Sequence, residues 1–258
     1  MTTRSRPSAL RLVLAAAFIA AAAPAQAQEV GYTASVYVGR GSYPAESDPV
    51  TSVYVFNGFD VTAGRVRAAV SVPYVRTTFR DLVVDPATGA ASTLEDTVSG
   101  FGDPLVRMDV RLFDDAARPL QVAVVGSVKV PVVDVDSRLG TGEMDVAAGG
   151  SLFTAMGGTS LFADLLFWKY GDPEGVDFED TLSYSVGVGR LLGASRWSAM
   201  VSLAGFSKGL EGAAAPVQLN AALLTLISRR QSIAISAGFG LNDSSGGFSL
   251  GTSWRISN

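Results

Sequence analysis

The chain has 258 residues, 48% of them hydrophobic and 17% charged, and its formal net charge is -4. It contains no histidine and no cysteine, which excludes Ser-His-Asp and Cys-His catalysis, histidine- or thiolate-ligated metals and disulfide bonds. The acidic balance argues against nucleic-acid binding. The mean hydropathy of +0.29 instead suggests a membrane protein.

Residues 1–27 have the three-part pattern of a secretory signal peptide. Arg4, Arg6 and Arg11 occur without any acidic residue, an apolar stretch runs from Leu12 to Ala23, and Ala25-Gln26-Ala27 matches a cleavage site. The apolar stretch is too short to span a bilayer comfortably. We therefore expect cleavage after Ala27 and a mature domain of residues 28–258.

The remaining chain predicts membrane-spanning strands and no membrane-spanning helix. Beyond residue 27 no run of 18 apolar residues occurs, which excludes spanning helices. Apolar and polar residues alternate in stretches of about ten residues between turn-forming residues, as in transmembrane β-strands. The predicted strands, in chain order, are 30–39, 51–62, 64–77, 100–112, 119–130, 143–155, 159–170, 180–191, 196–207, 216–228, 231–242 and 247–257.

These strands predict an all-β, antiparallel transmembrane barrel of about 12 strands. Long connections alternate with short ones, and both ends of the barrel sequence lie on the side of the short turns, so we expect short periplasmic turns and longer extracellular loops. The strands of a soluble β-sandwich or lipocalin-like barrel also alternate apolar and polar residues, but such a fold does not predict an apolar face that ends in aromatic residues. Aromatic residues near strand ends are Tyr74, Tyr184, Trp197, Phe206 and Trp254. The predicted location is the bacterial outer membrane, with lipid and lipopolysaccharide around the barrel.

Several short motifs resemble a known family. They are Val72-Pro73-Tyr74-Val75, Gly100-Phe101-Gly102-Asp103-Pro104, Lys129-Val130-Pro131, and Leu139-Gly140-Thr141-Gly142 followed by Asp145. Their order and spacing resemble the outer-membrane β-barrel family of transporters of the meta-pathway of phenol degradation. The resemblance implies a channel for the uptake of hydrophobic or aromatic compounds. The chain departs from most outer-membrane barrels at its end, Ser257-Asn258, where an aromatic residue usually serves recognition by the barrel-assembly machinery.

Charged residues in the middle of a strand must face the lumen, because a charge facing lipid at mid-depth costs about 2–4 kcal/mol. If residues 113–118 form a turn, Arg111 lies opposite Gln121 and Asp103 opposite Lys129, and the next hairpin brings Asp145 beside Lys129. We therefore expect a lumen charge ladder of Asp103, Lys129 and Asp145. It has two possible roles, a charged constriction or solute site, or cross-strand pairing that maintains the register, and the second is favoured because polar barrel interiors need internal pairing.

A second lumen set is rich in arginine. Arg65, Arg67, Arg107 and Arg111 share the lumen-facing parity with Asp109. This excess of positive charge is equally compatible with a preference for anions and with a passive, solvated wall. The predicted outer loops are acidic by contrast, and they are either simply solvated or bridged through divalent cations to lipopolysaccharide. We expect no metal site, no cofactor and no catalytic residue.

Two functions remain open. The first is an outer-membrane channel, similar to a porin, for the passive uptake of small hydrophobic or aromatic solutes. The second is a structural or adhesin-like barrel whose lumen is blocked by side chains, which a barrel of twelve strands permits. An outer-membrane enzyme is disfavoured, because the enzymes found on barrels of this size generally rely on histidine.

Overall fold

A computed structural model describes residues 28–41, 50–84, 91–115, 119–133, 137, 139–172, 178–193, 196–207 and 214–258. The expected signal peptide, residues 1–27, lies outside the described residues, as do parts of the acidic outer loops. No helix in the described part of the chain is long and apolar enough to cross a membrane.

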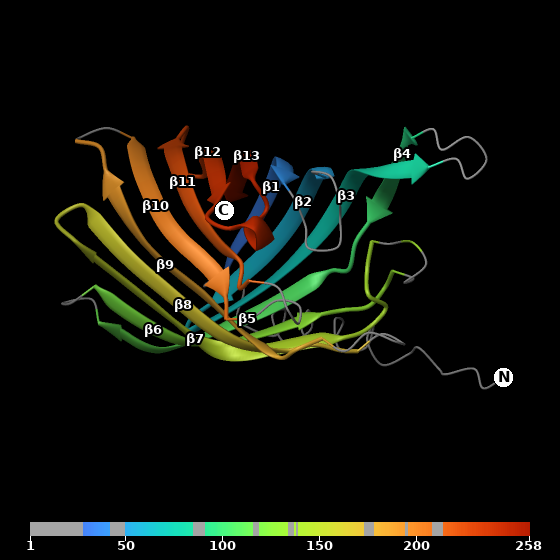
Figure 1. The fold of residues 1–258 in the computed structure, drawn as a ribbon. Coiled ribbons are helices and arrows are strands. Elements are labelled where there is room, and N and C mark those ends of the chain that lie inside the picture. The colour runs from blue at the N-terminus through green and yellow to red at the C-terminus, as the bar shows by residue number, and fades with distance from the viewer. Residues whose placement is uncertain are drawn as a thin grey trace.

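The described chain folds into antiparallel strands wrapped around a central space (Figure 1). The strands are β1 (Gln28–Gly41), β2 (Val50–Ala63), β3 (Val66–Val84), β4 (Ala91–Phe101), β5 (Leu105–Asp115), β6 (Leu120–Lys129), β7 (Asp145–Met156), β8 (Thr159–Lys169), β9 (Thr181–Leu191), β10 (Trp197–Phe206), β11 (Val217–Leu226), β12 (Gln231–Gly240) and β13 (Phe248–Ser257). One short 3-10 helix, η3 (Asp243–Ser245), precedes β13.

The strands close into a barrel with twelve positions. Each strand pairs with its neighbours in sequence except that β4 and β5 both pair with β3, and β1 pairs with β13 to close the sheet. Strands β4 and β5 together occupy one position, because β4 pairs with the outer part of β3 and β5 pairs with its inner part. The predicted transmembrane barrel of about 12 strands is therefore confirmed, and most predicted strand ends lie within two residues of the observed ones.

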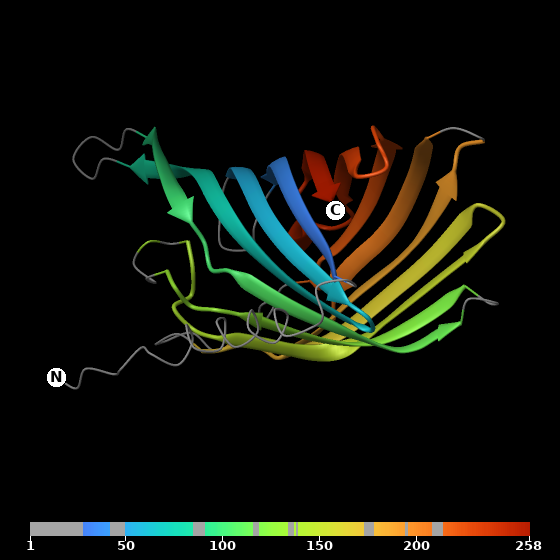
Figure 2. The ribbon, with the colours of Figure 1, turned by 180° about the vertical axis from the view of Figure 1, so that it is seen from behind.

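The largest departure from prediction is the stretch 78–99, which was expected to be a long loop. Strand β3 continues to Val84 and β4 returns from Ala91, so most of the stretch is a hairpin. Figures 1 and 2 show this β3–β4 hairpin projecting at the end of the barrel opposite the β7–β8 turn. A strand beyond the bilayer needs no apolar face, since only its backbone groups must pair, and the charged residues of this stretch therefore do not prevent strand formation.

The barrel closes where the last strand meets the first. Ten residue pairs join β1 and β13, from Gly31 opposite Ser257 to Arg40 opposite Phe248. The final residue reinforces this seam, because the Val30 amide donates to Asn258 Oδ1 at 2.8 Å and the Asn258 amide donates to the Val30 carbonyl at 3.1 Å. Asn258 thus extends the pairing of β13 with the start of β1.

Strand register separates a lipid face from a lumen face. The even-numbered residues of β1 and β13 carry the apolar face, with Val36, Val38 and Leu250 exposed, and the odd-numbered residues face the lumen with the charged side chains. Phe206 is an exception to the predicted aromatic belt, because it lies opposite lumen-facing Ser183 and so has the lumen parity. Packing is tight on the lumen side of β6–β8, where Val125 (0% exposed), Ala147 and Leu166 form a buried apolar cluster.

Candidate functional site in the barrel lumen

The three residues of the expected charge ladder lie together near the outer end of the lumen. Lys129 Nζ is 2.8 Å from Asp145 Oδ2 and 3.8 Å from Asp103 Oδ2. It also donates to Thr141 Oγ1 at 2.6 Å. The two carboxylates are almost completely buried, with side chains 3% (Asp103) and 9% (Asp145) exposed. We call Asp103, Lys129 and Asp145 the outer charge cluster.

The register that led to this cluster was only partly correct. Asp145 lies directly opposite Lys129, as expected. The residue opposite Lys129 on the other side is Leu105, and Arg111 lies opposite Ala123 rather than Gln121. Strand β5 runs on to Asp115, which pairs with Leu120, so the turn is shorter than expected. A bulge at Leu112 then shifts the pairing by one residue, and the register at Arg111 ends two residues from the expected one. Asp103 reaches Lys129 from the break between β4 and β5, outside the regular ladder.

Asp103 also holds a loop. Its Oδ1 accepts hydrogen bonds from the amides of Val132 and Val133, at 2.9 and 3.1 Å, at the start of the β6–β7 loop. Its Oδ2 faces Gly140, where an added Cβ would lie 2.6 Å away. Leu139 lies against Gly100 on the lumen side of β4. The glycine-rich motifs of the sequence therefore make room for the β6–β7 loop to pack against the barrel wall.

Asp145 has a similar second role on the neighbouring loop. The Gly171 amide, just after β8, donates to Asp145 Oδ1 at 3.1 Å. Burial, together with the negative charge of Asp145, raises the pKa of the adjacent Tyr170 to about 12. Lys129 thus sits between two carboxylates that each hold a loop, an arrangement that organises the outer mouth of the lumen.

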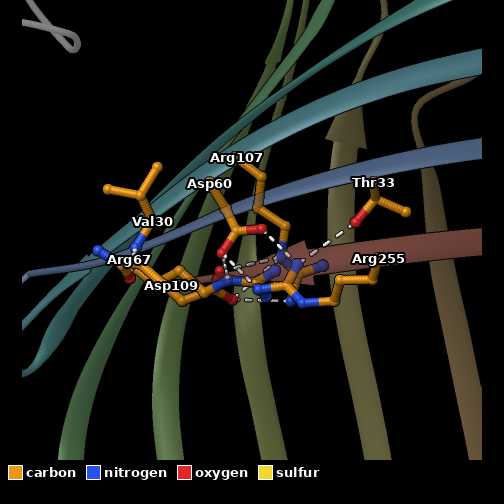
Figure 3. Close-up of polar contacts among 8 residues, drawn as sticks. Val30, Thr33, Asp60, Arg67, Arg107, Asp109 and Arg255 are labelled. Atoms are coloured by element: carbon orange, nitrogen blue, oxygen red, sulfur yellow. Dashed lines mark hydrogen bonds and ion pairs between the residues drawn. The ribbon is translucent and has the colours of Figure 1, made fainter. Parts of the chain in front are cut away.

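A second set of charges lies toward the short-turn end. Asp60 of β2 is nearly buried and receives two hydrogen bonds from Arg255 of β13, one of them Nη2 to Oδ2 at 3.0 Å. Arg67 of β3 approaches the same carboxylate, with Nε 3.5 Å from Oδ2. Arg255 reaches Asp60 across β1, where Gly31 leaves room, since a Cβ there would lie 2.4 Å from Arg255 Nη2. Figure 3 shows these side chains pointing toward one another.

Arg107 of β5 continues this set of charges across the lumen. Its Nη2 donates to Asp109 Oδ1 at 2.8 Å and to Asp164 Oδ1 at 3.1 Å. Asp164 lies on β8, so the Arg107 side chain extends past β6 and β7. Asp60, Arg67 and Arg107 also line one cavity of about 260 Å³. We call the six residues the lumen charge belt: Asp60, Arg67, Arg107, Asp109, Asp164 and Arg255.

The belt changes the interpretation of the expected arginine cluster. Arg67, Arg107 and Asp109 belong to it, but Arg65 lies in the β2–β3 turn and Arg111 donates to the carbonyl of Gly64 in that turn. Three carboxylates balance three guanidinium groups in the belt, so the excess of positive charge predicted there is neutralised.

Sequence reasoning missed Asp60, Asp164 and Arg255. Each is a charge inside a strand and on the lumen parity, and the rule that placed Arg107 in the lumen applies equally to them.

An aromatic pocket opens into the outer part of the lumen. Tyr37 of β1 and Tyr54 and Phe56 of β2 share the lumen face, with the Tyr54 and Phe56 rings stacked at 6.0 Å and Tyr37 edge-on to Phe56 at 5.9 Å. The pocket has a volume of about 390 Å³, and Gln218 and the loop before β13 line its other side. It combines flat apolar rings with a few polar groups, which is typical of small-molecule sites.

The sequence matches, over residues 27–256, the family described as "Putative MetA-pathway of phenol degradation". The chain belongs to this family. The resemblance expected from the motifs between residues 70 and 170 is confirmed, and the match extends over the whole barrel. No curated protein matches the chain.

Solved structures support the fold of this phenol-degradation family member. The barrel is similar to the COG4313 outer membrane channel from Pseudomonas putida F1, with a TM-score of 0.69, 13% identity, and coverage of 92% of this chain and 97% of that one. It is also similar to the translocator domain of autotransporter NalP from Neisseria meningitidis, with a TM-score of 0.52, 9% identity, and coverage of 95% and 93%. The protein therefore has the fold of a bacterial outer-membrane β-barrel.

Proposed function

We propose that this family member is a passive channel for small hydrophobic or aromatic solutes. The observation that carries the proposal is the pocket lined by Tyr37, Tyr54 and Phe56 at the outer end of the lumen. An apolar cavity of about 150 Å³ is sufficient to bind benzene, and this pocket is larger, at about 390 Å³. The family description and the channel named among the similar structures agree with this role.

The physical basis is weak, reversible binding at the entrance. Stacking of an aromatic ring on aromatic side chains contributes about 0.5–1.5 kcal/mol beyond area burial, enough to concentrate a solute without retaining it. Below the pocket, the lumen charge belt is paired internally, so a neutral solute meets no uncompensated charge there. The proposal assigns no catalytic role to any residue.

The test measures how strongly added phenol blocks the ionic current through the wild-type protein and through two variants. Purified protein in a planar bilayer is expected to conduct, and added phenol is expected to reduce the current. Phe56→Ala should weaken this block by about two- to tenfold, since it removes one stacking ring. Phe59→Ala, on the lipid face of the same strand and 56% exposed, should not change it. Conductance with an equal phenol block in all three proteins would contradict the aromatic site.

A specific observation favours the second candidate, a barrel without transport. The lumen wall of β6–β8 is covered by side chains, with Val125 fully buried, and the Arg107 side chain extends across two strands to Asp164. If these side chains fill the whole cross-section, the protein has no conductance and no solute uptake in liposome swelling. That result would support a structural or adhesin-like barrel.

The proposal also includes two partners. The barrel-assembly machinery would insert the chain. Lipopolysaccharide would surround the outer end, where the acidic loops lie.

A further inference from the structure

Four exposed arginines gather at the short-turn end of the barrel, over strands β9–β12. Arg190 is the next-to-last residue of β9 and Arg196 directly precedes β10, while Arg229 and Arg230 lie in the β11–β12 turn. The two turns are neighbours, because β10 pairs with β11 and Arg196 Nη1 donates to the Ile227 carbonyl at 3.5 Å. We call Arg190, Arg196, Arg229 and Arg230 the turn arginine cluster.

Within the described residues, no carboxylate forms an ion pair with this cluster. The segments 190–197 and 226–231 contain no aspartate or glutamate, and within the described part of the chain no ion pair involves these four side chains. Arg67, Arg107 and Arg255 in the lumen all have acidic partners. Four neighbouring positive charges, on a chain whose net charge is -4, create a local positive potential that attracts an external anion.

The position of the cluster identifies the source of that anion. Arg190 lies opposite Ala199, so it shares the lipid-facing parity with Trp197, which is 43% exposed at the end of the adjacent strand. Trp residues on the lipid face of barrels mark the level of the lipid headgroups. The turn arginines therefore lie at the headgroup level of the periplasmic leaflet, which consists of phospholipids.

We propose that the turn arginine cluster binds the phosphates of anionic phospholipids in the periplasmic leaflet. Guanidinium groups pair with phosphate oxygens through two parallel hydrogen bonds. Several arginines on adjacent turns favour a lipid with more than one phosphate, such as cardiolipin, over a zwitterionic lipid. The site lies outside the lumen and is independent of the proposed transport.

The test is native mass spectrometry of the folded full-length mature barrel with added cardiolipin, and with phosphatidylcholine as the neutral lipid. The triple variant R190Q/R229Q/R230Q keeps Arg196, which supports the neighbouring turn. Its matched control is R40Q/R76Q/K169Q, which also removes three positive charges from exposed, outward-facing positions but at the opposite end of the barrel. The charge-preserving triple R190K/R229K/R230K and a heat-modifiability gel check folding.

Each removed charge is expected to weaken cardiolipin binding about fivefold, so the turn triple should bind at least tenfold more weakly than wild type. The control triple should bind as wild type does, the Lys triple should retain most of the affinity, and wild-type binding should fall as salt is raised. Equal losses in the turn and control triples would overturn the proposal, as would wild-type binding of cardiolipin no tighter than that of phosphatidylcholine.

Discussion

Replacing Lys129 by Met removes the positive charge between two buried carboxylates. Asp103 and Asp145 would then face each other without a compensating cation, and Thr141 would lose its donor. Removing one member of a buried ion pair costs about 3–5 kcal/mol, because the remaining charge is left uncompensated. We expect Lys129→Met to lower the free energy of unfolding by an amount in this range.

The geometry predicts that the two carboxylates contribute unequally. Lys129 and Asp145 are in hydrogen-bond contact at 2.8 Å, and a hydrogen bond between charged groups contributes about 1.5–3 kcal/mol. The Lys129–Asp103 distance is 3.8 Å, and Asp103 Oδ2 has no hydrogen-bond partner. The coupling energy should therefore be about 2–3 kcal/mol for the Asp145 pair and about 1 kcal/mol for the Asp103 pair.

Two double-mutant cycles measure these couplings. Asp145→Asn and Asp103→Asn are each combined with Lys129→Met, and unfolding in urea is followed by tryptophan fluorescence of the refolded barrel. Lys169→Met, an exposed residue at the end of β8, serves as the control and should change stability little. Absence of coupling in both cycles, or a stronger coupling to Asp103 than to Asp145, would refute the reasoning.

Asp60→Asn removes one carboxylate from a charge belt with three acids and three bases, so the reversal potential in a salt gradient should shift toward anions; no shift would mean that the belt does not face the conducting path. Gly31→Ala places a Cβ against Arg255 and should destabilise the barrel by about 1–3 kcal/mol, measured by urea unfolding, whereas an unchanged midpoint would show that Arg255 can move aside. The raised pKa of Tyr170 means that the folded state holds the phenolic proton more tightly, so this contribution to stability is complete below pH 10 and is lost as pH rises toward 12. Tyr170→Phe should remove this part of the alkaline loss in pH-dependent unfolding, and an unchanged profile would contradict it.

The strands and their faces could be predicted because the membrane imposes a simple local rule. A residue in a barrel strand faces either lipid or lumen. In the segment 248–256, Phe248, Leu250, Trp254 and Ile256 share one face, and Thr252 is the only polar residue on that face. The β3–β4 hairpin was missed since this rule does not apply beyond the bilayer. There, backbone pairing alone determines whether a strand continues.

The sequence by itself determined the barrel, its strand number and the alternation that separates lumen-facing from lipid-facing residues. Only the tertiary structure decided which charges meet. The short turn after Asp115, together with the bulge at Leu112, determines the β5–β6 register. Arg255 and Arg107 reach Asp60 and Asp164 by extending over intervening strands. Closure of the sheet brings the lumen faces of strands that are distant in the chain toward one another. The alternation along a single strand shows which face a side chain is on, but not which side chains of other strands lie near it.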